Sequence, residues 1–229
     1  MDNKYLALPV RGKYRITEGW LYSDQEKKIH GLDFHGGVDF AQPRNSPVFA
    51  AADGWAIASY SLNPFFDEKT GKLRRFRGKI VGMGLGNFVQ IYHPQTKRFT
   101  QYGHLEKISE KIPFAKPRKL KDGRLIPMGH KINPRDLKNY PKAIWVRCGE
   151  VIGYVGDSGL TWEYNDYPNR PDHKKHPSWD ETHVHFEEFV RNSRGAKQRR
   201  DPFAIYDTNE KYPWPGHKGR KGDDGLWIK

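Results

Sequence analysis

Cysteine is almost absent from this chain, which has 229 residues and a single cysteine, Cys148. One thiol excludes an intrachain disulfide framework, and it also excludes a zinc site built from several thiolates. Any zinc site in the protein must therefore be formed by histidines and carboxylates.

Long apolar runs are missing as well. Hydrophobic residues make up 36% of the chain, the mean hydropathy is -0.90, and no run approaches the roughly 18 to 20 apolar residues of a membrane span. The first ten residues (MDNKYLALPV) lack the basic and apolar blocks of a signal peptide. Aromatic residues still make up 14%, a share that is unusual in disordered chains. We expect a soluble, folded chain without a membrane span.

Turn-forming residues are abundant, with 23 glycines and 16 prolines, and no sustained helical period occurs beyond short segments such as Pro134 to Asn139. Short apolar stretches between turn signals are typical of β structure, and we predict an all-β, mainly antiparallel, sandwich-like fold. Pro47 to Tyr60 is expected to form two strands that meet in a hairpin at Asp53-Gly54. Further strands are predicted at 87–93 and 98–102, which should pair, and at 150–155 and 183–190.

The length suits one large domain with insertions. We predict a domain over residues 1–206 with insertions at about 107–147 and 162–181, because both segments are polar, proline-rich and long for connections inside a compact domain. Residues 207–229 are expected to form a basic Gly/Pro-rich C-terminal tail.

The net charge is +13, from 40 basic and 27 acidic residues. Such an excess suits a solvated face or a polyanionic partner, such as nucleic acid, an anionic membrane or an acidic cell-wall polymer. Nothing in the charge pattern resembles a recognition helix or an aromatic RNA-binding signature, so nucleic acid is not the expected partner.

Two histidine motifs have the spacing of metal ligands. His35 and Asp39 flank Gly36 and Gly37, which let the chain curl so that imidazole and carboxylate converge. In the late strand, His183-Val-His185 places two imidazoles on one face. Two nitrogens and one oxygen leave a tetrahedral zinc one open position, which is the arrangement of catalytic sites. The motifs therefore predict metal-assisted hydrolysis.

Five phrases occur in the order found in the lysostaphin/LytM-type zinc endopeptidases of peptidoglycan, which this sequence resembles in segments from about residue 9 to 206: HGGVDFAQPRNSPVFAAADGWA, GNFVQIYH, TQYGHL, CGEVIGYVGDSG and THVHFEEF. The resemblance implies Zn²⁺ held in a groove by His35, Asp39 and His185. It also implies that His183 and His104 activate water and stabilise the transition state.

Two further residues are assigned from the same phrases and from strand geometry. Tyr102 is two residues from His104, so a continuing strand would place both on one face, where the phenol could support the oxyanion. Glu187 shares the face of His183 and His185, and it either orients an imidazole or is an edge carboxylate in solvent.

The resemblance implies action on the peptide stems of bacterial peptidoglycan, outside the cytoplasm or in the cell envelope, with anionic wall polymers as a further partner. Both insertions depart from the family's usual short links. Two other readings stay open: a noncatalytic LytM-like module that binds walls or activates other enzymes, and a basic nucleic-acid binder. No residue selects which cross-link bond is cleaved.

Overall fold

A computed structural model of the chain describes residues 4–20, 35–67, 69–76, 79–80, 82–126, 143–159, 182–193, 195–203 and 227–228. In these ranges every regular element is a β-strand, and all strand pairs within the sheets are antiparallel, so the predicted all-β fold is confirmed. No helix in these ranges has the length and apolarity that crossing a membrane requires.

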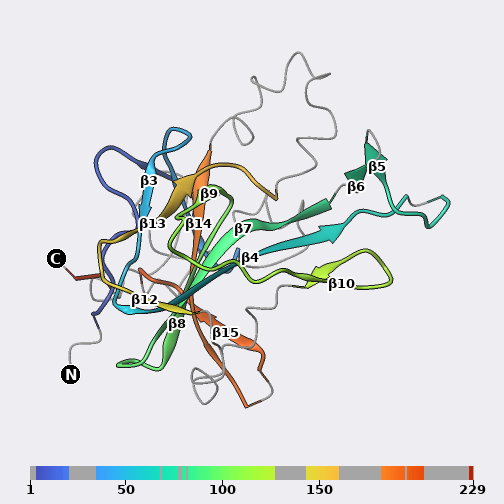
Figure 1. The fold of residues 1–229 in the computed structure, drawn as a ribbon. Helices are drawn as coiled ribbons and strands as arrows, with labels where there is room; N and C mark the ends of the chain where they lie inside the picture. The colour runs from blue at the N-terminus through green and yellow to red at the C-terminus, as the bar shows by residue number, and fades with distance from the viewer. Residues whose placement is uncertain are drawn as a thin grey trace, which may run out of the picture.

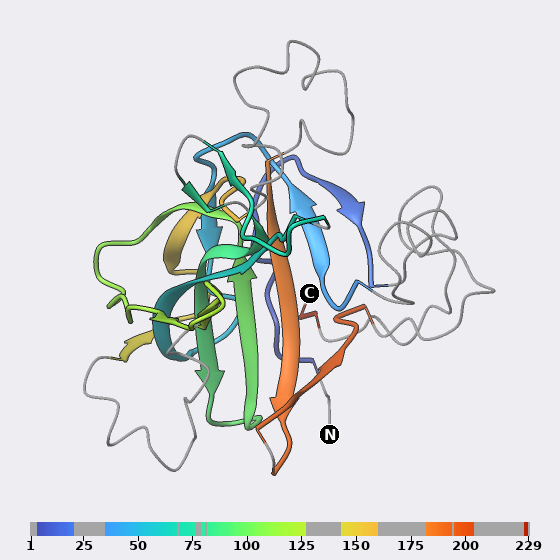
Figure 2. The same cartoon turned by 90° about the vertical axis from the view of Figure 1, so that its right-hand side faces the viewer.

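The larger sheet contains the long central strands and runs in the order β1-β2-β14-β8-β7-β4-β11-β10, with β15 also paired to β14 and β12 also paired to β4. The sheet is curled, and the long strands β4 and β7 lie within it (Figures 1 and 2). Its strands are β1 (Arg15–Glu18), β2 (Val38–Ala41), β4 (Gly54–Pro64), β7 (Gly82–His93), β8 (Arg98–Gly103), β10 (Arg118–Lys119), β11 (Leu125–Ile126), β12 (Ile144–Val146), β14 (His183–Arg191) and β15 (Lys197–Arg200).

A smaller sheet, in the order β3-β13-β9, is formed by β3 (Pro47–Phe49), β13 (Val151–Val155) and β9 (Leu105–Ile108). The main core cluster draws on both sheets, with Phe40 and Phe186 from the larger sheet and Val48 and Leu105 from the smaller one. A separate two-stranded hairpin, β5 (Arg75–Phe76) and β6 (Lys79–Ile80), projects beyond the ends of β4 and β7 (Figure 1).

Strand alternation gives the larger sheet two chemically different faces. In β14, Val184 and Phe186 are fully buried in the main core cluster, so His183, His185 and Glu187 point to the opposite face. The paired registers place the following residues on that opposite face, which we call the histidine face: Asp39, Gln90, Gln101, His183, His185, Glu187, Phe189, Lys197 and Arg199.

Most predicted strands are present, but one predicted hairpin is wrong. The segments 87–93 and 98–102 pair as β7 and β8, whereas β3 pairs with β13 and β4 pairs with β7. Asp53-Gly54 therefore leads from one sheet to the other instead of closing a hairpin. Gly54 has backbone and side-chain atoms of β7 within 3.0 Å of where a Cβ would lie, so close packing on β7 explains a glycine there.

Parts of the predicted insertions lie outside the described residues, namely 127–142, which includes the short helical pattern at 134–139, the whole of 162–181, and 204–226 of the tail region. The described part of 107–147 adds β10, β11 and β12 along the edge of β4. Trp227 is buried among Phe40, Phe186 and Phe203 and bridges to Leu6.

Candidate metal centre

The pairing of β2 with β14 builds the centre of the site. These strands run antiparallel with Asp39 directly opposite His185, so a carboxylate and an imidazole from distant parts of the sequence project together on the histidine face. His185 Nδ1 lies 2.8 Å from Asp39 Oδ1. His35 enters from the turn before β2, and its Nε2 lies 3.6 Å from Asp39 Oδ2.

His35, Asp39 and His185 thus come together as the resemblance implied. One ligand atom from each lies within 4.8 Å of those from the other two, and the two imidazole rings meet edge to face with centroids 4.6 Å apart. Among the described residues, no other group of three or more histidine, cysteine or carboxylate side chains has this spacing.

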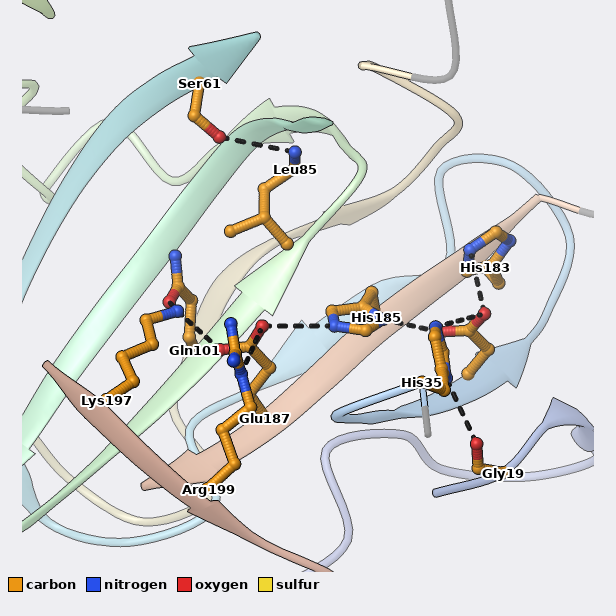
Figure 3. Close-up of polar contacts among 11 residues, drawn as sticks. Gly19, His35, Ser61, Leu85, Gln101, His183, His185, Glu187, Lys197 and Arg199 are labelled. Carbon is orange, nitrogen blue, oxygen red and sulfur yellow. Dashed lines mark hydrogen bonds and ion pairs between the residues drawn. The ribbon is translucent and has the colours of Figure 1, made fainter. Parts of the chain in front are cut away.

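Hydrogen bonds on the far sides of the two imidazoles fix their orientation (Figure 3). His35 Nδ1 donates to the carbonyl oxygen of Gly19 at 3.2 Å, and His185 Nε2 donates to Glu187 Oε1 at 3.4 Å. Histidines that bind metals nearly always donate their other ring N–H to a carbonyl or carboxylate in this way. His35 Nε2 and His185 Nδ1 therefore face the centre, and this donor set of two imidazoles and one carboxylate fits Zn²⁺.

Both positions of the glycine pair in the His35 turn disfavour a side chain. Gly36 adopts a φ of 87°, a conformation that side chains disfavour. At Gly37 a Cβ would lie 2.5 Å from His185 Cε1 and 2.6 Å from His185 Nε2. Because such distances are clashes, only glycine allows His185 to reach the centre.

Burial and charge set the protonation of the ligands. Burial, against the opposing charge of Asp39, lowers the pKa of His35 to about 4, so this imidazole is neutral at pH 7. Burial also lowers the pKa of His185, but hydrogen bonds to Asp39 and Glu187 more than offset it and raise that pKa to about 9. A cation must therefore displace the Nδ1 proton of His185, and metal and proton compete for that nitrogen.

His104 and His183 lie beside these ligands. Their ring centroids are 4.9 Å apart, and His183 Nε2 is 3.4 Å from Asp39 Oδ2. His104 Nδ1 donates to the Ser158 carbonyl oxygen at 2.8 Å, which leaves its Nε2 as the nitrogen for proton transfer. All five side chains assigned to ligation or proton transfer, namely His35, Asp39, His104, His183 and His185, are thus adjacent.

Tyr102 does not lie with them. Its neighbour on β14 is Phe186, so Tyr102 is on the core face, where its phenol accepts a hydrogen bond from the Ala51 N–H at 2.8 Å and lies 3.0 Å from Thr100 Oγ1. The prediction assumed that the strand continues to His104, but β8 ends at Gly103 and His104 has a φ of 59°. This left-handed residue breaks the alternation, and only the imidazole reaches the histidine face.

Glu187 is 4% exposed, so it is not a solvent-facing edge carboxylate. Besides His185, it contacts Lys197 and Arg199 of β15. Burial raises the pKa of Glu187, but the charge of Lys197 and the hydrogen bond to His185 lower it well below the usual value. Sequence reasoning missed both cations, although their i, i+2 spacing after the Gly195 turn was a signal for one face of a strand.

Comparisons with known proteins find distant likenesses. No family model and no curated protein matches the chain. One similar solved structure is a catalytic-domain mutant of the prophage-encoded protein EnpA from Enterococcus faecalis, with 18% identity, a TM-score of 0.44 and coverage of 86% of this chain and 95% of that chain. A second is the catalytic domain of the antimicrobial peptidase lysostaphin from Staphylococcus simulans, with 18% identity, a TM-score of 0.42 and coverage of 82% of this chain and 89% of that chain. A third is a zinc-containing peptidase from Vibrio cholerae, with 21% identity, a TM-score of 0.42 and coverage of 86% of this chain and 39% of that chain.

Proposed function

We propose that this protein is a zinc-dependent endopeptidase that hydrolyses the peptide cross-links of bacterial peptidoglycan. The observation that carries the proposal is the convergence of His35, Asp39 and His185, with the imidazoles turned by hydrogen bonds at their outer nitrogens. The substrate class rests on the motifs that resemble lysostaphin/LytM-type enzymes.

The three ligands would hold the ion through His35 Nε2, His185 Nδ1 and the Asp39 carboxylate. When bound at such a site, zinc supplies a Lewis acid for the scissile carbonyl. It also lowers the pKa of water, so that the water can be deprotonated to a nucleophile near neutral pH. Three protein ligands suit this chemistry because they leave a coordination position for the reactants.

His183 and His104 supply the proton chemistry in this proposal. Hydrolysis moves one proton from the attacking water to the leaving amine, and negative charge develops on the carbonyl oxygen. The rings of His104 and His183 lie 4.9 Å apart at the edge of the ligand cluster, where two imidazoles can share these tasks. The phenol of Tyr102 bonds within the core, so the proposal gives it no part in the chemistry.

The proposal places the protein outside the cytoplasm or in the cell envelope, where its substrate is. There the net charge of +13 would favour contact with anionic wall polymers at low ionic strength.

The ligand and proton-transfer roles separate in a pair of variants. His185→Ala should abolish both zinc binding and the release of soluble muropeptides from purified walls. His104→Asn should keep stoichiometric zinc but lower turnover by about 10²- to 10³-fold. Asparagine is the suitable replacement because it tolerates the positive φ of residue 104.

His93→Gln is the matched control, because His93 is buried and hydrogen-bonded to Asp53 and Thr100 away from the cluster; it should keep zinc and activity. Undiminished muropeptide release by His185→Ala would contradict the ligand assignment.

A zinc-loaded wild-type protein that binds walls without releasing muropeptides would be a noncatalytic module. Binding to DNA or RNA that falls steeply with salt and ignores zinc would favour the nucleic-acid reading.

A further inference from the structure

Behind the metal centre lies a charged cluster that the proposed reaction does not use directly. It consists of Glu187 on β14, Gln101 on β8, and Lys197 and Arg199 on β15 (Figure 3). Lys197 Nζ is 2.5 Å from Glu187 Oε2 and 2.5 Å from Gln101 Oε1. Arg199 Nε is 3.3 Å from Glu187 Oε1.

The Lys197 ammonium is held on several sides. Besides the two oxygens, it lies over the Phe189 ring at 4.6 Å from the centroid, and its side chain is only 11% exposed. A buried ammonium is strongly disfavoured unless it is paired and hydrogen-bonded. These contacts satisfy it and fix its position, so Glu187 Oε2 is fixed too.

Fixing one oxygen of Glu187 determines where the other points. With Oε2 on Lys197, Oε1 faces His185 Nε2 at 3.4 Å. This contact keeps the proton of a neutral His185 on Nε2 and turns Nδ1 toward Asp39. Arg199 adds a second link, because a Cβ on Gly36 would lie 3.1 Å from its Cδ, so its aliphatic stem packs on the turn that carries His35.

We propose that Lys197 and Arg199 are positioning residues for the metal ligands, acting on His185 through Glu187 and, for Arg199, on the His35 turn. The proposal rests on the metal centre of the proposed function. It predicts that a cation near the metal strengthens metal binding, whereas Coulomb repulsion between like charges alone predicts the reverse.

The test is the zinc affinity of Lys197→Met, measured in the folded protein by competition with a chelator. Methionine keeps an unbranched side chain of similar length and removes the charge. We expect zinc affinity to fall about 10- to 100-fold, the usual effect of losing a group that orients a ligand, and Lys197→Arg to restore part of it. Unchanged or tighter zinc binding by folded Lys197→Met would overturn the proposal.

Lys111→Met is the matched control, since Lys111 forms an exposed ion pair with Glu150; its zinc affinity should equal that of wild type. A second readout is the ¹⁵N NMR spectrum of His185 in the zinc-loaded proteins, where wild type should carry its proton on Nε2 and Lys197→Met should lose that defined signal. The same Nε2–H signal in Lys197→Met would count against positioning.

If Lys197→Met does not fold, Arg199→Met replaces it, because the Arg199 side chain is 34% exposed and its loss leaves Lys197 in place. We then expect a severalfold loss of zinc affinity, and an unchanged affinity overturns the proposal. Wild type that binds zinc without cleaving peptidoglycan would refute the proposed function alone. Wild type that binds no zinc would refute both.

Discussion

At the scale of single residues, the candidate metal centre depends on the lack of a side chain at Gly37. His185 occupies the volume above Gly37 where any other residue would place its Cβ. The phrase His35-Gly-Gly therefore combines two requirements, a turn through the left-handed conformation of Gly36 and an opening at Gly37.

Gly37→Ala tests this opening. Its methyl group would clash with the His185 ring and lie 2.8 Å from the Phe186 carbonyl oxygen, so we expect a loss of about 1 to 3 kcal/mol of folding free energy together with weaker zinc binding. Urea unfolding and chelator competition would measure the two effects. Gly71→Ala, at a positive φ and with no described residue within 4 Å of the added Cβ, should lose stability through backbone strain but keep the zinc affinity of wild type. Equal zinc affinity in both variants would show that zinc binding does not require the space that Gly37 leaves for the His185 ring.

The sequence predicted which side chains come together in the cluster where local patterns point to them. His35, Asp39 and His185 could be named because spacing and motif resemblance pointed to the same side chains. Tyr102 was misplaced because the left-handed φ of His104 leaves no mark in the residue types. Lys197 and Arg199 were missed because a basic stretch is ordinarily a solvated surface.

At the scale of elements, His104 is held where β7 contacts the turn at Ser158 and Gly159. Its backbone N–H donates to Leu85 O at 2.7 Å, and its ring bonds to the Ser158 carbonyl. The chain around Leu85 and the chain around Ser158 touch through Gly86 and Gly159, where a Cβ on either glycine would lie 2.2 Å from backbone atoms of the other segment.

Gly159→Ala should therefore disturb catalysis without touching a ligand. Separating β7 from this turn moves both hydrogen-bond acceptors of His104, and misplacement of a catalytic group by about 1 Å can cost roughly 10²-fold in rate. We expect muropeptide release to slow at least tenfold while zinc stoichiometry is unchanged. Gly195→Ala is the control, with a similar φ of 78° and, in the part of the chain that the structure describes, no atom within 4 Å of the added Cβ. Loss of zinc from Gly159→Ala would show that the contact of β7 with this turn supports the ligands instead.

Strand existence was easier to predict than strand partnership. The β7 and β8 segments are neighbours in sequence with a short turn between them, so periodicity and proximity agreed. Asp53-Gly54 has hairpin chemistry, yet β3 has only three residues and pairs with β13. Pairing between distant segments depends on packing against the core, which turn residues do not encode.

At the scale of the whole molecule, residues from opposite ends of the sequence close the core. Trp227 is 8% exposed and bridges to Leu6, and its ring centroid lies 6.0 Å from that of Phe40, a residue of β2 beside Asp39. A region predicted to be a basic tail thus contains an aromatic anchor, which its Gly/Pro-rich composition concealed.

Trp227→Ala should cost about 3 to 5 kcal/mol in the free energy of unfolding, as expected for removing a buried aromatic side chain. Trp227→Phe should cost much less, because the buried indole N–H has no hydrogen-bond partner among the described residues, so its removal leaves none of their polar groups unpaired. Ile228→Ala, at a site that is 47% exposed, should change stability by less than about 0.5 kcal/mol. Denaturant unfolding would compare all three, and equal losses at 227 and 228 would contradict anchoring by Trp227.

The pairing of Asp39 with His185 joins residues 146 positions apart. Closing so long a loop carries an entropic cost, and pairings this distant in sequence slow folding. During synthesis, no chain that ends before His185, the third residue of β14, contains all three proposed metal ligands. A metal held as proposed would therefore need β2 and β14 already paired, and once bound it would stabilise that pairing against reopening.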